Sequence, residues 1–152
     1  MKKLVMTDND SIEFTRISKK IKLLSSITVG LLEKILNRIF LYQYERGEIV
    51  CKQGEIGDCF YVLSQGKLRV SVREAFFFSK TVAILDSGDC FGEMSLIAKK
   101  PRNATITCIE PSKIFVLTYE QFNQILEENP LFKEEINRIF DKRQSELEQL
   151  KK

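Results

Sequence analysis

The first forty residues carry their hydrophobic side chains at helical spacing. One stripe, with offsets of 0, 3, 7 and 10, consists of Phe14, Ile17, Ile21 and Leu24. A second stripe consists of Ile27, Leu31, Ile35 and Ile39. Between the two stripes, Ser25, Ser26 and Thr28 offer side-chain oxygens that can cap the N-terminus of a helix. The pattern predicts helices over residues 12–39.

From about Leu41 to Thr118 the pattern changes to short runs that are typical of strands. The predicted strands are Glu48–Lys52, Cys59–Leu63, Leu68–Val72, Thr81–Leu85, Ala104–Ile109 and Lys113–Leu117. Their alternation is clearest in residues 67–72, where Leu68, Val70 and Val72 share one face. Glycines separate the runs at positions 47, 54, 57, 66 and 88. Regular short strands with glycine turns favour a sandwich or barrel over a βαβ fold.

Three consecutive phenylalanines, Phe76 to Phe78, lie between two of these strands. We expect the run to begin the next strand and to be buried. The alternative is an exposed patch that docks on a partner or on a membrane surface.

After Thr118 the helical period returns. The pattern predicts one helix over Tyr119–Glu128, which Asn129 and Pro130 end, and a second from Leu131 towards Lys152. Ile136, Phe140, Leu147 and Leu150 share one side of the second helix, which either packs on the strands or pairs two chains. Arg143 occupies an inward position in that stripe and weakens the case for a coiled coil.

The composition suits a single soluble domain. The chain has 152 residues, of which 43% are hydrophobic and 30% charged. Its net charge of +3 is too small to indicate nucleic-acid binding. No apolar run approaches the ~20 residues of a membrane-spanning helix, and the N-terminus does not resemble a signal peptide. We therefore expect a cytoplasmic protein without membrane insertion.

The cysteines and the missing histidine bear on chemistry. Cys51, Cys59, Cys90 and Cys108 form no CxxC pair, so we expect reduced core cysteines and no metal site. The chain contains no histidine, which removes the commonest general base and every Ser–His or Cys–His pair. We expect a binding protein, with no catalytic residues and no cofactor, rather than an enzyme.

One segment, from Phe91 to Ile106, interrupts the strands and carries a set of polar residues suited to an anionic ligand. Gly92 allows a close backbone approach, and the following residues to Ile97 can form one short helical turn. Arg102 can hold a phosphate with its planar fork. Glu93 is a poor phosphate ligand but a good acceptor for a sugar hydroxyl. The alternative is a structural ion pair between Glu93 and Arg102.

This segment resembles the phosphate-binding cassette of the cyclic nucleotide-binding domain family. Phe91-Gly92-Glu93 is followed, after eight intervening residues, by Arg102-x-Ala104-Thr105, and Asp89 and Pro101 also fit. The segment from Gly54 to Gly66 and the helical flanks extend the resemblance over nearly the whole chain. It implies an α+β fold: an antiparallel β-roll, of the double-stranded β-helix or jelly-roll type, flanked by N-terminal helices and by C-terminal helices.

The resemblance also implies roles for individual residues. Arg102 would pair with the cyclic phosphate, helped by backbone N–H groups near Met94, Ser95 and Ala104. Glu93 would accept a hydrogen bond from the ribose 2′-OH, and the last helix would act as a lid. The ligand-binding residues implied are Phe91, Gly92, Glu93, Met94, Ser95, Arg102, Asn103 and Ala104.

Two positions depart from the family's pattern. Ser95 stands where alanine is common, which is a small change. Asn103 follows the arginine, where many cAMP binders carry Ala and cGMP-selective relatives often carry Thr. We favour cAMP over cGMP.

We expect a single cyclic nucleotide-binding domain over residues 1–152. Its parts would be N-terminal helices (1–40), a β-roll (41–118) that includes the cassette (91–106), and C-terminal helices (119–152). The nucleotide would shift those helices and signal to a separate effector protein, without direct nucleic-acid binding and with a possible homodimer through the C-terminal helix. Alternatively, the chain is a scaffold that kept the fold without the nucleotide, or a fragment of a longer protein.

Overall fold

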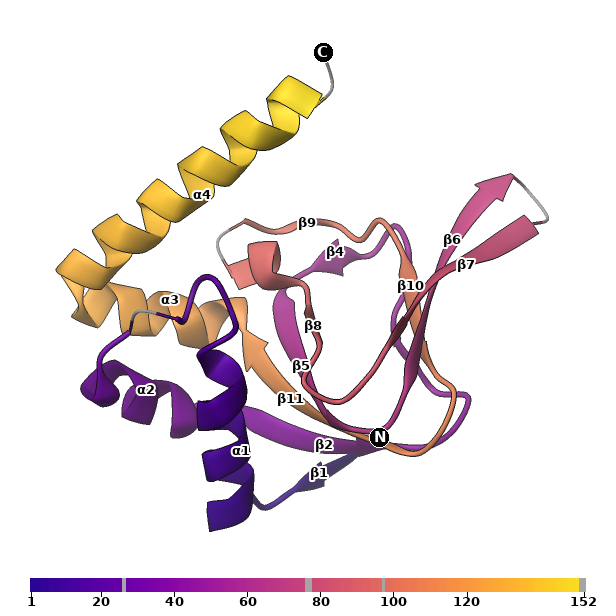
Figure 1. The fold of residues 1–152 in the computed structure, drawn as a ribbon, viewed down its shortest axis with the longest axis horizontal. Coiled ribbons are helices and arrows are strands. Elements are labelled where there is room, and N and C mark those ends of the chain that lie inside the picture. The colour runs from indigo at the N-terminus through magenta and orange to yellow at the C-terminus, as the bar shows by residue number, and fades with distance from the viewer. Residues whose placement is uncertain (26, 76–77, 97, 151–152) are drawn as a thin grey trace.

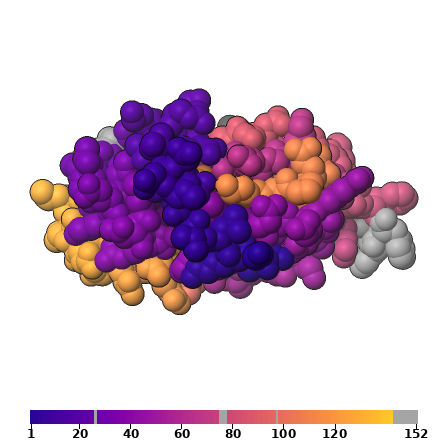
Figure 2. Space-filling model, turned by 90° about the horizontal axis from the view of Figure 1, so that it is seen from below, coloured from indigo at the N-terminus to yellow at the C-terminus, as the bar shows by residue number. Residues whose placement is uncertain are grey.

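The computed structural model describes residues 1–25, 27–75, 78–96 and 98–150, and of residues 75 and 143–150 the backbone alone. Its helices lie on one side of a β-roll, and a long hairpin projects from the other side (Figure 1). Seen from below, the N-terminal segment lies across the middle of the molecule, between the C-terminal helices and the hairpin (Figure 2). This arrangement confirms the predicted α+β fold, in which helices precede and follow the β-roll along the sequence.

The helices are α1 (Asp8–Ser18), α2 (Val29–Leu36), α3 (Tyr119–Glu128) and α4 (Pro130–Leu150), with a short 3₁₀ helix η1 (Glu93–Leu96). The longer strands are β2 (Phe40–Tyr44), β5 (Cys59–Gln65), β6 (Leu68–Ala75), β7 (Phe78–Leu85), β10 (Thr105–Cys108) and β11 (Ser112–Thr118). The short strands are β1 (Lys2–Leu4), β3 (Ile49–Cys51), β4 (Ile56–Gly57), β8 (Cys90–Phe91) and β9 (Lys100–Pro101).

The roll is built from two antiparallel sheets. One has the order β1-β2-β11-β5-β8 and the other β3-β10-β6-β7, while β4 and β9 pair separately. All six strands predicted from the alternation are present, with ends that move by a few residues. The strand β2 was not predicted. The shorter strands β1, β4, β8 and β9 were also missed, because two or three residues are too few to display a period.

The central strands β5 and β11 of the five-stranded sheet are buried on both faces. In β5, Phe60 and Val62 face the helices and belong to one core cluster. Tyr61 and Leu63, on the opposite face, belong to a second cluster that fills the roll. A strand covered on both sides needs no polar face, and this explains the unbroken apolar run of β5 in the sequence.

The predicted helical stretch over residues 12–39 is corrected to two shorter helices separated by turns. Thr7 caps α1 in a capping box with Asp10, and Thr28 caps α2 by accepting a hydrogen bond from the Leu31 N–H (3.2 Å). In the turns between them Ile21, Leu23 and Leu24 are still buried. The backbone of these residues is irregular, but their side chains are part of the core. The spacing of hydrophobic residues here therefore indicated burial and not a continuous helix.

The expected burial of Phe78 is wrong. The residue begins β7, as predicted, but its side chain is 75% exposed. It stands on the projecting hairpin, beyond the region where the five-stranded sheet covers the roll (Figure 1). Phe76 and Phe77 lie outside the described residues.

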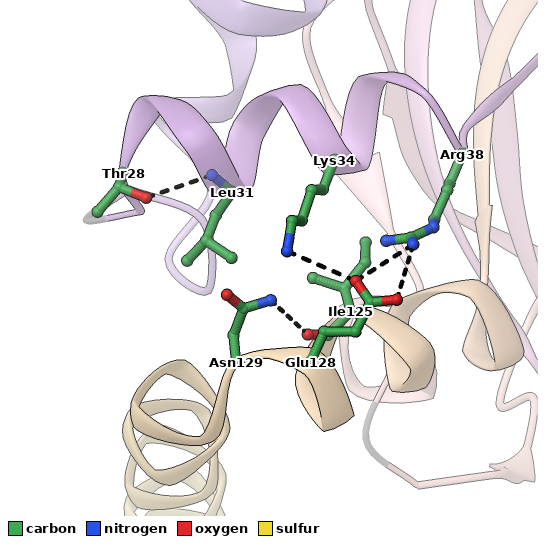
Figure 3. Close-up of polar contacts among 7 residues, drawn as sticks. All are labelled: Thr28, Leu31, Lys34, Arg38, Ile125, Glu128 and Asn129. Atoms are coloured by element: carbon green, nitrogen blue, oxygen red, sulfur yellow. Dashed lines mark hydrogen bonds and ion pairs between the residues drawn. The ribbon is translucent and has the colours of Figure 1, made fainter.

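The C-terminal helices begin and end close to the predicted residues. Thr118 caps α3, and α4 packs back on α3 through the buried Phe132 and Ile136. Lys34 of α2 and Arg38, just after α2, both reach Glu128 of α3, at 3.5 and 3.1 Å, and so connect the two helical flanks (Figure 3). Within the described part of the chain, no helix is both long enough and apolar enough to span a membrane.

Candidate functional site

The backbone of Arg102 is tied to the turn that precedes β4. Its N–H donates to the Glu55 carbonyl oxygen (2.7 Å), and its own carbonyl accepts from the Gly54 N–H (2.8 Å). The adjacent strand β9 pairs with β4. These bonds hold the start of the Arg102 side chain in a fixed position against β4.

The guanidinium of Arg102 lies between two glycines. A β-carbon built on Gly57 would stand 2.6 Å from Nε of Arg102, and one built on Gly92 would stand 2.5 Å from Nη1. Gly92 also has a φ of +79°, a backbone angle that residues other than glycine rarely adopt. Glycine is thus needed at both positions for this arginine to lie where it does.

Two further contacts orient the guanidinium. Its Nη2 donates to the carbonyl oxygen of Cys59 (2.5 Å), and its Cζ lies 5.6 Å from the centre of the Tyr61 ring. Tyr61 in turn stacks on Phe91, with ring centres 4.7 Å apart. The predicted site residue Phe91 therefore contacts the arginine indirectly, by packing on the Tyr61 ring.

Glu93 opens the short helix η1 and is half-buried. Its Oε1 accepts a hydrogen bond from the backbone N–H of Leu23 (3.0 Å), in the turns between α1 and α2. The cassette is thereby attached to the N-terminal helical segment. The structure shows Glu93 and Arg102 contacting these other groups, so the contacts described give no support to the structural ion pair considered from sequence.

The remaining predicted residues differ in exposure. Ser95 is buried, and its Oγ would stand 2.8 Å from a β-carbon on Gly57, close to the arginine. Its N–H donates to the Gly92 carbonyl oxygen (2.9 Å). Met94 and Ala104 are half-buried, whereas the side chain of Asn103 is exposed.

The Cys59 thiol and the Tyr61 phenol near Arg102 are kept neutral. Burial raises the pKa of the Cys59 thiol to about 11, and the neighbouring Asp58 adds to the effect. Burial likewise raises the pKa of Tyr61. The positive charge of Arg102 is therefore not matched by a thiolate or a phenolate at neutral pH. In the described residues, no group of three or more His, Cys, Asp or Glu side chains could hold a metal ion.

Four contributors to this site were missed in the sequence. They are Gly57, Cys59, Tyr61 and Leu23, which all touch its polar groups. Gly57 lies in the segment from Gly54 to Gly66, which carries part of the family resemblance. That resemblance was the only sign in the sequence that Gly57 could belong to the site. Leu23 contributes a backbone N–H, which leaves no trace in the residue type.

Comparisons with known proteins agree with this geometry. The family described as "Cyclic nucleotide-binding domain" matches residues 41–129. A cGMP-dependent protein kinase of Eimeria tenella is 31% identical over 106 residues, which is 70% of this chain and 10% of that protein. A cAMP-dependent protein kinase regulatory subunit of Dictyostelium discoideum is 35% identical over 85 residues, covering 54% of this chain and 26% of that protein.

Solved structures share the fold. The N-terminal domain of a transcriptional regulator from Streptomyces coelicolor A3(2) superposes with a TM-score of 0.79 at 19% identity, covering 90% of this chain and 95% of that one. A cyclic nucleotide-binding domain from Methylobacillus flagellatus KT does so with a TM-score of 0.77 at 22% identity, covering 97% and 83%. The chain spans about a tenth to a quarter of the length of the two kinase relatives. With a family match over more than half its length, the chain belongs to the cyclic nucleotide-binding domain family.

Proposed function

We propose that this domain binds a cyclic nucleotide, cAMP in preference to cGMP, and that binding repositions its C-terminal helices to signal to a separate effector protein. The observation that carries the proposal is the convergence of Arg102, Gly92 and Ser95 of the cassette on Gly57, which comes from a separate segment of the chain. Arg102 supplies the positive charge for the phosphate. Its guanidinium is already oriented, so little side-chain freedom is lost when the ligand binds.

Glu93 provides the acceptor for the ribose hydroxyl. One of its oxygens already accepts the Leu23 N–H, and a carboxylate has further lone pairs for a second donor. A ligand hydroxyl at Glu93 would share that carboxylate with the N-terminal segment. Phe91, Met94 and Ala104 complete the proposed binding residues around the arginine and the helix η1.

The preference for cAMP rests on Asn103. Its side chain is exposed beside the cassette, and it is not the threonine common among cGMP-selective relatives. Both a cGMP-dependent and a cAMP-dependent kinase protein are among the relatives, so similarity alone does not favour either base.

The C-terminal helices contact the cassette in two places and Asp58, which precedes β5, in a third. Leu96 of η1 shares a core cluster with Phe122 and Ile125 of α3. The ammonium of Lys99 lies 5.0 Å from the centre of the Tyr119 ring, and the Tyr119 N–H donates to the Asp58 carbonyl oxygen (2.7 Å). A shift of the cassette on binding would therefore displace groups that contact the first turn of α3.

Calorimetric titration with cAMP and with cGMP tests the proposal. We expect binding of both, tighter for cAMP, and a loss of about 2–5 kcal/mol for Arg102→Ala because a buried phosphate loses its charged partner. Arg46→Ala, which removes an exposed arginine elsewhere, serves as the control and should bind as the parent does. Absence of heat with either nucleotide, together with an unchanged melting temperature, would instead favour the nucleotide-free scaffold.

A further inference from the structure

A hollow of about 650 Å³ lies on the four-stranded sheet, and among the described residues Thr105 is the one cassette residue in its lining. This volume falls within the usual range of small-molecule sites. All four strands or their adjoining turns contribute to its lining, which includes Lys52, Gln53, Ser71, Arg73, Ser79 and Thr105. We call it the outer hollow.

The outer hollow is on the opposite face of the sheet from Arg102. Successive residues of a strand point to opposite faces. The side chain of Arg102 lies against Gly57 and Gly92, and Ile106 is buried inside the roll. Arg102 also lies against Tyr61, which belongs to the same inner cluster as Val70 and Ile106. Ser71 and Thr105, the strand neighbours of Val70 and Ile106, line the outer hollow instead, so the sheet separates the hollow from Arg102.

Hydrogen bonds of Gln53 fix the shape of the outer hollow. β10 pairs with β6 only as far as Thr105 opposite Ser71. Beyond that pair, the Gln53 side chain takes the place of a strand: its Oε1 accepts from the Arg73 N–H (2.8 Å), and its Nε2 donates to the Arg73 carbonyl (3.5 Å). The Gln53 N–H also donates to Oγ1 of Thr105 (3.0 Å). The floor is therefore held in place before any ligand arrives.

The lining is cationic and rich in hydroxyl groups. Lys52 and Arg73 contribute two positive charges, and the lining has no carboxylate. Among the described residues neither cation forms an ion pair, although the Glu55 carboxylate accepts the backbone N–H of Lys52 (3.4 Å). Hydroxyls of Ser71, Ser79 and Thr105 face the same space.

We propose that the outer hollow is a second ligand site, which binds a small phosphate monoester. A phosphate oxyanion can accept hydrogen bonds from a guanidinium, an ammonium and hydroxyls together. Ile49, at the edge of the hollow and 46% exposed, offers an apolar contact to the organic part. A concave, polar hollow of this volume fits a small molecule better than the flat surface of a macromolecule.

The test is an NMR titration of the full chain with inorganic phosphate, ribose 5-phosphate and uncharged ribose at constant ionic strength. We expect both phosphates to shift the amide signals of Gln53, Ser71, Arg73 and Thr105 in a saturable way, and ribose to leave them unchanged. Tighter binding of ribose 5-phosphate than of phosphate would indicate contact with the organic part, and equal binding would indicate recognition of the oxyanion alone. In the Arg102→Ala variant these shifts should persist, which separates the outer hollow from the cassette and from the proposed nucleotide binding.

Paired variants distinguish a built site from general attraction of anions. Lys52→Gln with Arg73→Gln should weaken phosphate binding at these amides by about tenfold or more. Lys19→Gln with Lys20→Gln removes the same charge from the exposed end of α1 and should have little effect. Lys52→Arg with Arg73→Lys, which retains the charges, should keep most of the affinity even if the glutamine pair is unstable. Equal weakening by both glutamine pairs, or no saturable shift in the parent, would overturn the proposal.

Discussion

At the residue scale, the position of one side chain depends on what two others lack. The Arg102 guanidinium occupies the space that β-carbons at Gly57 and Gly92 would need. The carbonyl of Cys59 and the ring of Tyr61 then orient it. The motif supplies the arginine, but Gly57 and Gly92 leave the space that its guanidinium occupies.

Gly92→Ala should therefore abolish most nucleotide binding without removing a polar group. The new β-carbon meets Nη1 of Arg102 at 2.5 Å, and the φ of +79° adds backbone strain. We expect a loss of stability of about 1–2 kcal/mol as well as displacement of the arginine. Calorimetry and denaturant unfolding measure the two effects.

Gly30→Ala is the matched control, because a β-carbon there finds only Oγ1 of Thr28, at 4.0 Å. It should leave nucleotide affinity unchanged. If Gly92→Ala bound nucleotide as tightly as the parent, the close approach would have no role in binding.

At the scale of elements, capping residues set where helices begin, and buried faces hold the helices on the roll. Capping residues decide where α1 and α2 begin. Buried residues such as Ile35 and Phe122, both fully covered, hold the helices on the roll. The ion pairs of Lys34 and Arg38 with Glu128 lie at the surface, where such pairs contribute little.

The N-terminus of α1 should make stability depend on pH through Asp10. Burial opposes its charge, but hydrogen bonds from Thr7 and the Lys113 ammonium outweigh burial and hold the pKa of Asp10 below 3.8. A lowered pKa means that the stabilisation is complete above the ordinary value and is lost as the pH falls through the lowered one. Asp10→Asn should cost about 1–2 kcal/mol at pH 7.

Denaturant unfolding of the parent and of Asp10→Asn, repeated from pH 7 to below pH 4, measures this difference. The difference should shrink at the acid end of the series. Asp8→Asn, an exposed neighbour in the same helical turn, should change stability much less. A difference for Asp10→Asn that is the same at every pH would rule out the charge as its source.

The connection between α2 and α3 gives a second prediction at this scale. Ile125 is fully buried, so Ile125→Ala should cost about 2–5 kcal/mol. Glu128→Gln breaks both surface ion pairs, yet should cost less than about 1 kcal/mol. Thermal unfolding compares the two variants, and a larger effect of Glu128→Gln would show that the ion pairs, rather than the core, hold this interface.

At the scale of the whole molecule, the cassette lies at a junction. Glu93 contacts the turns that follow α1, and Lys99 contacts the start of α3. The last helix, α4, contacts the rest through α3 and extends away from the roll (Figure 1). A ligand at the cassette is thus placed to influence both helical flanks at once.

Nucleotide at about a hundred times its dissociation constant should raise the free energy of unfolding by about 2.7 kcal/mol. If binding also repositions the C-terminal helices, hydrogen exchange in α3 and in residues 130–142 should change beyond this general protection. Arg102→Ala under the same conditions should show neither change. Protection of the roll with unaltered exchange in the helices would refute the signalling role while leaving ligand binding intact.

The sequence by itself determined the features that depend on near neighbours. The alternation of Leu68, Val70 and Val72 predicts a half-buried strand, and Thr118 with Asn129 and Pro130 delimits α3 to the residue. The cassette motif likewise lies within a stretch of sixteen residues, Phe91 to Ile106. Such patterns are local, because strand and helix periods repeat over a few positions.

Only the tertiary structure decided which groups meet across long separations. The Leu23 N–H and Glu93 are 70 positions apart, and Arg102 and the Cys59 carbonyl are 43 apart. Backbone donors and acceptors are the same in every residue type, so no residue pattern could have revealed these partners. The same holds for Phe78, whose hydrophobic side chain is exposed because the hairpin carries it beyond the covering sheet. Folding therefore turns a recognisable motif into an oriented site by bringing glycines and carbonyls from distant segments around Arg102.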